Sequence, residues 1–252
     1  MKVSFNRRLL RIFAAELEKL ATLPTIRFNL MAAFMLNLVL AAAFTSAGLQ
    51  GAAGTQAILN TGLASMEYLQ TGFIVLGVLS ACSEYTGGQI RTTLTVMPWR
   101  GLLLSAKLLV LALVTVPAAF IIAGSGILYS FFMMKETAAG IEIGTVISSL
   151  TGATGYLTLT TLLSAAISIV LRRSTPAMVV LLSYYFIVSP LTMGILPGIS
   201  HYFPDRAGYY MYTPFTFAEA DALTALQGTG LSLSWTLMFI SAAIGLYRRR
   251  DA

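Results

Sequence analysis

The chain alternates between long apolar runs and short polar segments. Six runs of about 20 or more mostly apolar residues follow one another, at 26–46, 65–83, 107–133, 145–171, 177–199 and 229–247. A helix needs about 20 such residues to cross the ~30 Å hydrocarbon core of a bilayer. The alternation of apolar and polar residues that is typical of membrane β-strands does not compete with these runs. The pattern therefore predicts an all-α polytopic membrane protein, a single transmembrane domain over 1–252 with six spanning helices.

The N-terminal residues follow a different pattern. Between residues 3 and 23, apolar side chains recur at helical spacing and basic side chains occupy the opposite side. This pattern is typical of an amphipathic helix that lies in the membrane interface, and Pro24 is expected to end it. It does not fit a cleaved signal peptide, which has a uniformly apolar centre. A solvated basic tail is the alternative interpretation.

Composition agrees with a membrane protein. Hydrophobic residues make up 57% of the chain and charged residues only 10%, against about 25% charged in an ordinary soluble domain. So few charges would not cover the surface of a soluble fold. Cys82 is the single cysteine, which excludes a disulfide scaffold.

The basic residues predict the orientation. With a cytoplasmic N-terminus, 14 of the 16 Lys and Arg residues fall in the inside segments, and only Lys135 and Arg206 fall outside. Such an asymmetry is typical of cytoplasmic loops. We therefore expect a multi-pass protein of a bacterial-type plasma (inner) membrane with both termini in the cytoplasm. The net charge of +6 is then explained by the basic residues of the cytoplasmic segments, and no nucleic-acid partner is expected.

Several kinds of chemistry find no support in the sequence. The phosphate-binding pattern G-x-x-x-x-G-K-[ST] is absent, and one histidine and one cysteine do not make a metal site. Gly124-Ser125-Gly126 invites comparison with an intramembrane serine protease, but the only histidine, His201, is predicted at the outer mouth. We expect the chain not to be an enzyme and to hold no cofactor of its own.

The connection between the second and third runs, 84–100, has a distinct pattern. A Gly87-Gly88 pair precedes the apolar residues Ile90, Leu94 and Met97, and Pro98 follows. Spacing of this kind predicts a short cytoplasmic helix with an apolar docking face. Arg100 and Lys107 are expected to pin the return of the chain to the lipid headgroups.

The same connection resembles the signature cytoplasmic segment of ABC-2 type transporter permeases. The residues that carry the resemblance cover about a tenth of the chain and are Glu84, Tyr85, Gly88, Arg91, Thr93, Leu94, Pro98, Arg100 and Lys107. The resemblance implies the half-size membrane subunit of an exporter, paired with a second permease half of the same or a different sequence. It also implies two separate ATPase subunits that bind ATP and Mg and drive alternating access through the short coupling helix. The cargo implied is an amphipathic small molecule, antibiotic, peptide or lipid.

The resemblance implies a translocation path along the first, second and fifth spans. The polar and soft residues of these spans are Asn37, Glu67, Gln70, Thr71, Ser183, Tyr184, Tyr185 and Met193. Asn37 has an alternative role as a helix–helix hydrogen bond. Tyr184 and Tyr185 have alternative roles in packing or in an aromatic belt, and Glu67 could lie at the interface in contact with water.

The segment before the last run, 200–228, is long, rich in tyrosine and interrupted by Pro204 and Pro214. Its helix-like stretches are too short to span, which predicts re-entrant or interfacial helices at the outer face. Two other functions remain beside the exporter. One is a membrane immunity or binding protein that sequesters an antimicrobial without pumping it, and the other, less favoured, is the intramembrane protease.

Overall fold

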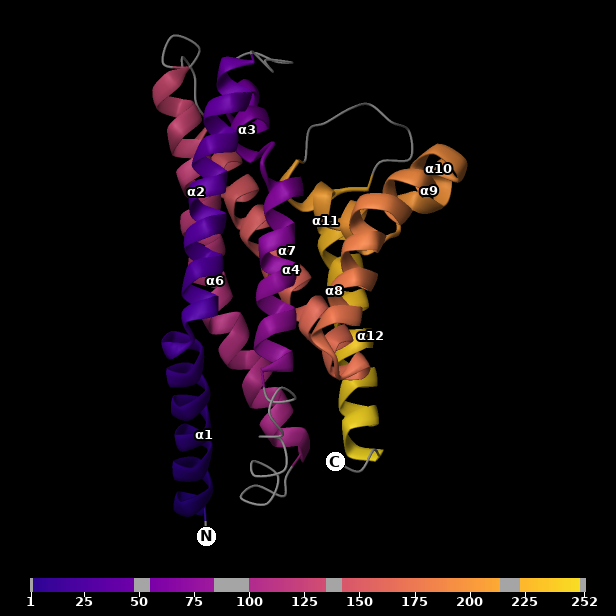
Figure 1. The fold of residues 1–252 in the computed structure, drawn as a ribbon. Helices are drawn as coiled ribbons and strands as arrows, with labels where there is room; N and C mark the ends of the chain where they lie inside the picture. Colours follow the sequence, from indigo (N-terminus) through magenta and orange to yellow (C-terminus); the bar gives the residue numbers. More distant parts are fainter. Residues whose placement is uncertain (1, 48–54, 84–99, 135–141, 214–222, 250–252) are drawn as a thin grey trace.

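The chain folds into a bundle of helices (Figure 1). The computed structural model describes residues 2–47, 55–83, 100–134, 142–213 and 223–249, and no strand occurs among them. The helices run in the order α1 (Lys2–Thr22), α2 (Pro24–Ser46), α3 (Thr55–Leu63), α4 (Met66–Cys82), α6 (Arg100–Met133), α7 (Ile143–Leu171), α8 (Ser174–Ser183), a π-helix η2 (Tyr184–Val188), α9 (Ser189–Ile195), α10 (Pro197–Ser200), α11 (Pro204–Tyr212) and α12 (Ala225–Arg249). The predicted all-α class is confirmed.

Among the described residues, five helical segments are long and apolar enough to cross a membrane: α2, α6, α7, the continuous α8–η2–α9 segment and α12. A sixth span results if α3 and α4, which meet at a bend of 41°, are counted together. The chain is therefore a helical protein with five or six apolar helices able to span a bilayer. The second predicted run corresponds to α4, which has only 17 residues and is short for a spanning helix.

The boundaries differ from the predicted ones by four residues or more at three spans, one of which is α12, which begins at Ala225 rather than at 229. Helix α6 begins at Arg100, seven residues before the predicted start at 107. The fifth span ends at Ile195 rather than at 199, and Leu196 leaves the helical conformation with φ −136° and ψ 66°. Leu196 precedes Pro197, and a residue before proline is disfavoured in the helical region for steric reasons.

Helix α7 is the central element of the bundle. It contacts α4, α6, α11 and α12, and it is the most buried of the spans. Several of its hydroxyl side chains bond within the helix, as where Thr161 donates to the carbonyl of Leu157 at 2.8 Å. Small residues then allow close approach. A Cβ atom added to Gly77 of α4 would lie 2.4 Å from the carbonyl oxygen of Thr161.

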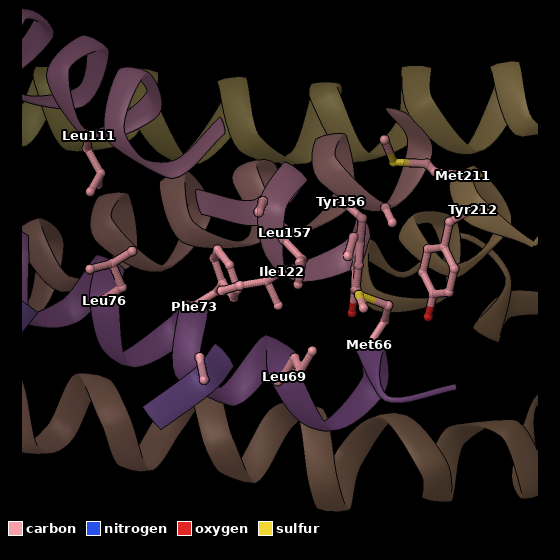
Figure 2. Packing of buried hydrophobic residues seen from close by; sticks show 14 of the residues in the cluster. Met66, Leu69, Phe73, Leu76, Leu111, Ile122, Tyr156, Leu157, Met211 and Tyr212 are labelled. Carbon is pink, nitrogen blue, oxygen red and sulfur yellow. The ribbon is translucent and has the colours of Figure 1, made fainter. Parts of the chain in front are cut away.

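The apolar core lies on either side of α7. Figure 2 shows Phe73 of α4 near Leu157 of α7 and Ile122 of α6, with Leu76 of α4 and Leu111 of α6 farther along the same cluster. All five side chains are buried. Each buried aliphatic or aromatic side chain of this size contributes about 1.5–3 kcal/mol through removal from water. Within a bilayer the same side chains stabilise the bundle mainly by packing.

The N-terminal helix predicted for 3–23 is present as α1, but its orientation differs from the expected one. In Figure 1, α1 runs along the direction of α2 rather than across the bundle. Among its described side chains, Ile12 packs with Leu103 and Ala106 at the start of α6. Protein thus covers part of the apolar side of α1 around Ile12, whereas Leu17 on the same helix is 40% exposed.

The short helices of the segment before the last span are partly as predicted. Helix α11 packs against α7 and α12, and α10 precedes it, whereas the predicted helical stretch 216–226 lies mostly outside the described residues. The contacts of α11 are very close. A Cβ atom at Gly152 of α7 would lie 1.9 Å from the carbonyl oxygen of Met211, and one at Gly228 of α12 would lie 2.5 Å from that of Ala207. Glycine at these positions fixes α11 against the bundle.

Candidate functional site

A pocket of about 200 Å³ lies where the start of α4, the middle of α7, the α8–η2–α9 segment and α11 meet. It is lined mainly by aromatic and charged side chains: Glu67, Tyr68, Gln70, Tyr156, Tyr185, Phe186, Ser189, Pro190, Asp205, Arg206, Tyr209 and Tyr212. The start of α4 lies toward the end of the bundle opposite to the start of α1 and the end of α12 (Figure 1). We call this site the tyrosine pocket.

A local break in the fifth span shapes one wall of the tyrosine pocket. Pro190 has no backbone N–H, and its ring would collide with the carbonyl group one turn earlier in a regular helix. The chain widens into the π-helix η2 just before it, where the N–H of Ser189 bonds to the carbonyl of Tyr184. Such π-helical turns often accompany functional sites. Here the widened turn directs Tyr185, Phe186 and Ser189 into the pocket.

Asp205 joins this wall to α11. The Tyr184 hydroxyl donates to Oδ1 of Asp205 at 2.8 Å, and the Ser189 hydroxyl donates to Oδ2. Asp205 also lies in the first turn of α11, where a negative charge is favoured by the helix dipole. Both carboxylate oxygens therefore have donors, and Asp205 is a fixed part of the pocket wall.

Tyrosines of α7 and α11 also line the pocket. The Tyr156 hydroxyl on α7 donates to the side-chain oxygen of Gln70 on α4. The Tyr156 ring lies 5.5 Å from that of Tyr212, and Tyr212 lies 5.5 Å from Tyr209, measured between centroids. Figure 2 shows Tyr156 and Tyr212 side by side with their hydroxyl groups turned the same way. Burial raises the pKa of the Tyr212 phenol well above its usual value, and the Glu67 carboxylate raises the pKa further.

The charged side chains Arg206 and Glu67 differ in burial and in their contacts. Arg206 is half-buried, and its guanidinium carbon lies 5.8 Å above the centroid of the Tyr209 ring, a cation–π contact. Glu67, in the first turn of α4, is exposed and accepts no hydrogen bond from the residues that the structure describes. With Asp205 engaged by two hydroxyl groups, Glu67 is the carboxylate that is left to meet a ligand.

Some residues predicted for the path come together here and others do not. Glu67, Gln70 and Tyr185 line the tyrosine pocket, and Tyr184 supports it through Asp205. The other predicted path residues do not line it: Asn37, Thr71, Ser183 and Met193.

Asn37 lies in a separate polar junction and is fully buried. Its Nδ2 donates to the carbonyl of Ile122 at 2.7 Å and to the Ser125 hydroxyl at 2.9 Å. The Ser65 hydroxyl donates to its Oδ1 at 2.6 Å. Asn37 thus joins α2 to α6 and to the bend before α4, which is the helix–helix role that the sequence left open.

The same junction bears on the protease alternative. The Ser125 hydroxyl donates to the carbonyl of Ile122 at 2.8 Å and accepts from Asn37. The only histidine has another partner, since Nδ1 of His201 lies 2.6 Å from the Tyr210 hydroxyl. These contacts give Ser125 a structural role in helix packing. Among the described residues, no group of three or more His, Cys, Asp or Glu side chains is arranged to hold a metal ion.

The predicted coupling segment falls almost wholly outside the described residues. The predicted coupling residues that lie outside the described part are Glu84, Tyr85, Gly87, Gly88, Ile90, Arg91, Thr93, Leu94, Met97 and Pro98. Arg100 begins α6. Lys107 was expected at the headgroups, but it lies within α6, seven residues after the start of the helix, and its side chain is buried with 7% exposure.

Sequence reasoning missed most of the tyrosine pocket. The residues not singled out for it are Tyr68, Tyr156, Phe186, Ser189, Pro190, Asp205, Arg206, Tyr209 and Tyr212. One signal was available for Tyr156, which is the only aromatic residue in the whole of α7. The π-helical turn that brings Ser189 and Asp205 together has no comparable mark in the sequence apart from Pro190.

Comparison with known proteins leaves the family open. No protein-family model matches the chain, and no curated protein matches it. The likeness to ABC-2 permeases therefore rests on the motif residues of 84–107 and on the order of the apolar helices.

Proposed function

We propose that this chain is the membrane permease subunit of an ATP-driven exporter of a bacterial-type inner membrane. The observation that carries the proposal is the motif between Glu84 and Lys107, together with the helices that flank it. Helix α4 ends and α6 begins toward the end of the bundle where α1 starts and α12 ends (Figure 1). A coupling segment between these two helices would face the same side as the termini, where a soluble ATPase would bind.

The energy source is proposed to be a separate protein. The chain has no phosphate-binding loop of its own, so ATP and Mg would be bound by two partner ATPase subunits. Movement of the coupling segment would then be transmitted to α4 and α6, which both contact α7. Such a movement would alter access to the centre of the bundle.

The surface of the bundle is compatible with a paired permease. Apolar side chains of α2 are strongly exposed, among them Phe28 (70%) and Val39 (64%), as are Val179 (59%) and Leu191 (58%) of the fifth span. Lipid or a second permease half, of the same or a different sequence, would cover these side chains. The cargo is proposed to be an amphipathic small molecule, antibiotic, peptide or lipid.

The experiment pairs the chain with an ATPase in sealed vesicles. Inverted vesicles that contain both subunits should accumulate a fluorescent amphipathic cargo only when ATP and Mg are present. Deletion of residues 87–97 should abolish this uptake, and so should replacement of the phosphate-binding lysine of the ATPase by alanine. ATP-dependent uptake that persists at the same rate in the deletion variant would contradict the coupling role.

A non-pumping immunity or binding protein is the second candidate. The tyrosine pocket favours it in one respect, because a polar and aromatic pocket away from the termini could bind an antimicrobial without any ATPase. Cells that express the chain alone distinguish the two. Resistance that survives inactivation of the ATPase supports sequestration, and resistance that is lost supports export.

A further inference from the structure

The tyrosine pocket has the composition of a site for a positively charged organic group. Aromatic rings attract cations through the negative potential of their faces. Six aromatic side chains line the pocket, namely Tyr68, Tyr156, Tyr185, Phe186, Tyr209 and Tyr212. Its ionisable carboxyl and guanidinium groups are Glu67, Asp205 and Arg206, so acidic charge exceeds basic charge by one.

One cation already occupies an aromatic face at this site. The guanidinium group of Arg206 lies over the Tyr209 ring at 5.8 Å from the centroid. This contact engages the one basic side chain among the lining residues with a ring. It also shows that the Tyr209 ring presents its face, and not only its edge, to a charged group.

The two carboxylates of the pocket, Asp205 and Glu67, have different surroundings. Both oxygens of Asp205 accept hydrogen bonds, from Tyr184 and Ser189, which fixes this residue in the wall. Glu67 has no such donor among the described residues and is exposed at the pocket. A carboxylate without hydrogen-bond donors beside aromatic rings is the counter-charge that an ammonium group requires.

We infer that the tyrosine pocket binds a small organic ammonium ion, with Glu67 as counter-charge and the surrounding tyrosine rings in contact with the substituents on nitrogen. The volume of about 200 Å³ sets the size of this ligand. A cavity of ~150 Å³ holds benzene, so an ammonium group with a few carbons fits. The inference does not depend on ATP-driven export, because a binding site of this kind could serve a pump or a non-pumping protein equally.

Choline is a suitable probe, and its uncharged isostere, in which carbon replaces the ammonium nitrogen, is the matched control. The full chain, purified in a maltoside detergent that carries no ammonium group, is titrated with each compound by calorimetry. Choline should bind in a saturable manner, and the isostere should bind at least about fivefold more weakly, the effect expected when a cation–π contact is removed. Equal affinity for the two compounds, or no binding of choline, would overturn the inference.

Two variants test the residues involved. Glu67→Gln should weaken choline binding by about fivefold, the upper range for an exposed charge pair, and should leave the affinity for the isostere unchanged. Glu142→Gln removes another exposed acid that does not line the pocket and should change neither affinity. Choline affinity that is the same in Glu67→Gln as in the unmodified chain would overturn the role of Glu67 and with it the site.

The rings are tested at Tyr68, which is 49% exposed. Tyr68→Leu should weaken choline binding by about threefold, whereas Tyr68→Phe should restore it, because the ring face is retained. Unchanged thermal unfolding of both variants shows that the fold is intact. Equal choline affinity in the leucine and phenylalanine variants would contradict an aromatic contact at this position.

Discussion

Tyr184 donates a hydrogen bond of 2.8 Å to Asp205, and this bond ties the π-helical turn of the fifth span to the short helix α11. Ser189 donates to the other oxygen of the same carboxylate. A single side chain therefore holds together two elements that the sequence separates by the break at Leu196 and Pro197. The tyrosine pocket exists in its present shape because of this attachment.

Removal of the Asp205 carboxylate should destabilise the bundle. In Asp205→Ala the Tyr184 and Ser189 hydroxyl groups lose their acceptor, and loss of a partner for a buried polar group costs about 1–3 kcal/mol. The midpoint of thermal unfolding in detergent should fall. Asp205→Asn keeps one oxygen acceptor and should lower the midpoint less. Equal midpoints for the alanine variant and the unmodified chain would mean that the attachment contributes nothing.

Asn37 should matter more for stability than Asn29, another asparagine of α2. Asn37 bonds to Ile122, Ser125 and Ser65, whereas Asn29 makes a single bond of 2.8 Å to the carbonyl of Gly72. Interhelical hydrogen bonds in membrane proteins are worth about 0.6–1.7 kcal/mol each. Asn37→Ala should therefore lower the free energy of unfolding by about 2 kcal/mol, and Asn29→Ala by less than half as much. Equal losses in a denaturant titration would contradict the junction.

Gly152 should tolerate no side chain, because α11 lies directly against it. Gly152→Ala introduces a Cβ atom 1.9 Å from the carbonyl oxygen of Met211, and the backbone of α11 must shift to accept it. Overpacking of this kind costs about 1–3 kcal/mol. Gly144→Ala on the same helix meets nothing within 4 Å and is the control. Thermal unfolding should separate the two variants, and identical midpoints would show that α11 is not packed as described.

The Tyr212 phenol should make stability depend on alkaline pH. Burial raises its pKa in the folded chain above the value of about 10 found in an unfolded chain. The stability gained from the protonated phenol is complete below pH ~10 and is lost as the pH rises above it, since the unfolded chain then releases the proton first. Tyr212→Phe should flatten this loss in unfolding measurements between about pH 9 and 11. An unchanged slope would contradict burial of the hydroxyl group.

The apolar pattern was sufficient to predict the helices but not their ends. The length of an apolar run predicts that a span exists, but it does not show that α6 begins at Arg100, where Leu103 and Ala106 pack against Ile12 of α1. The bend between α3 and α4 was missed for a related reason. Gly62, next to this bend, lies directly against Gly126 of α6, and residues so far apart in the sequence give no local signal.

The candidate site was predictable only in part. Glu67 and Gln70 attract notice because polar residues are costly in a membrane run. Tyr212 and Asp205 belong to the segment for which short re-entrant or interfacial helices are predicted, but their role depends on where α11 packs. The orientation of α1 could not be predicted either, because an amphipathic pattern does not distinguish a lipid surface from a protein surface such as Leu103 and Ala106.

The most direct measurement of the central claim is ATP-driven transport by the reconstituted pair. Sealed inverted vesicles that contain the chain and its ATPase should take up cargo with ATP, and vesicles with the chain lacking residues 87–97 should not, although that variant remains folded by thermal unfolding. Uptake that requires ATP and disappears in the deletion variant is the predicted result. Cargo retention that is independent of ATP, or transport that persists without residues 87–97, would contradict the account.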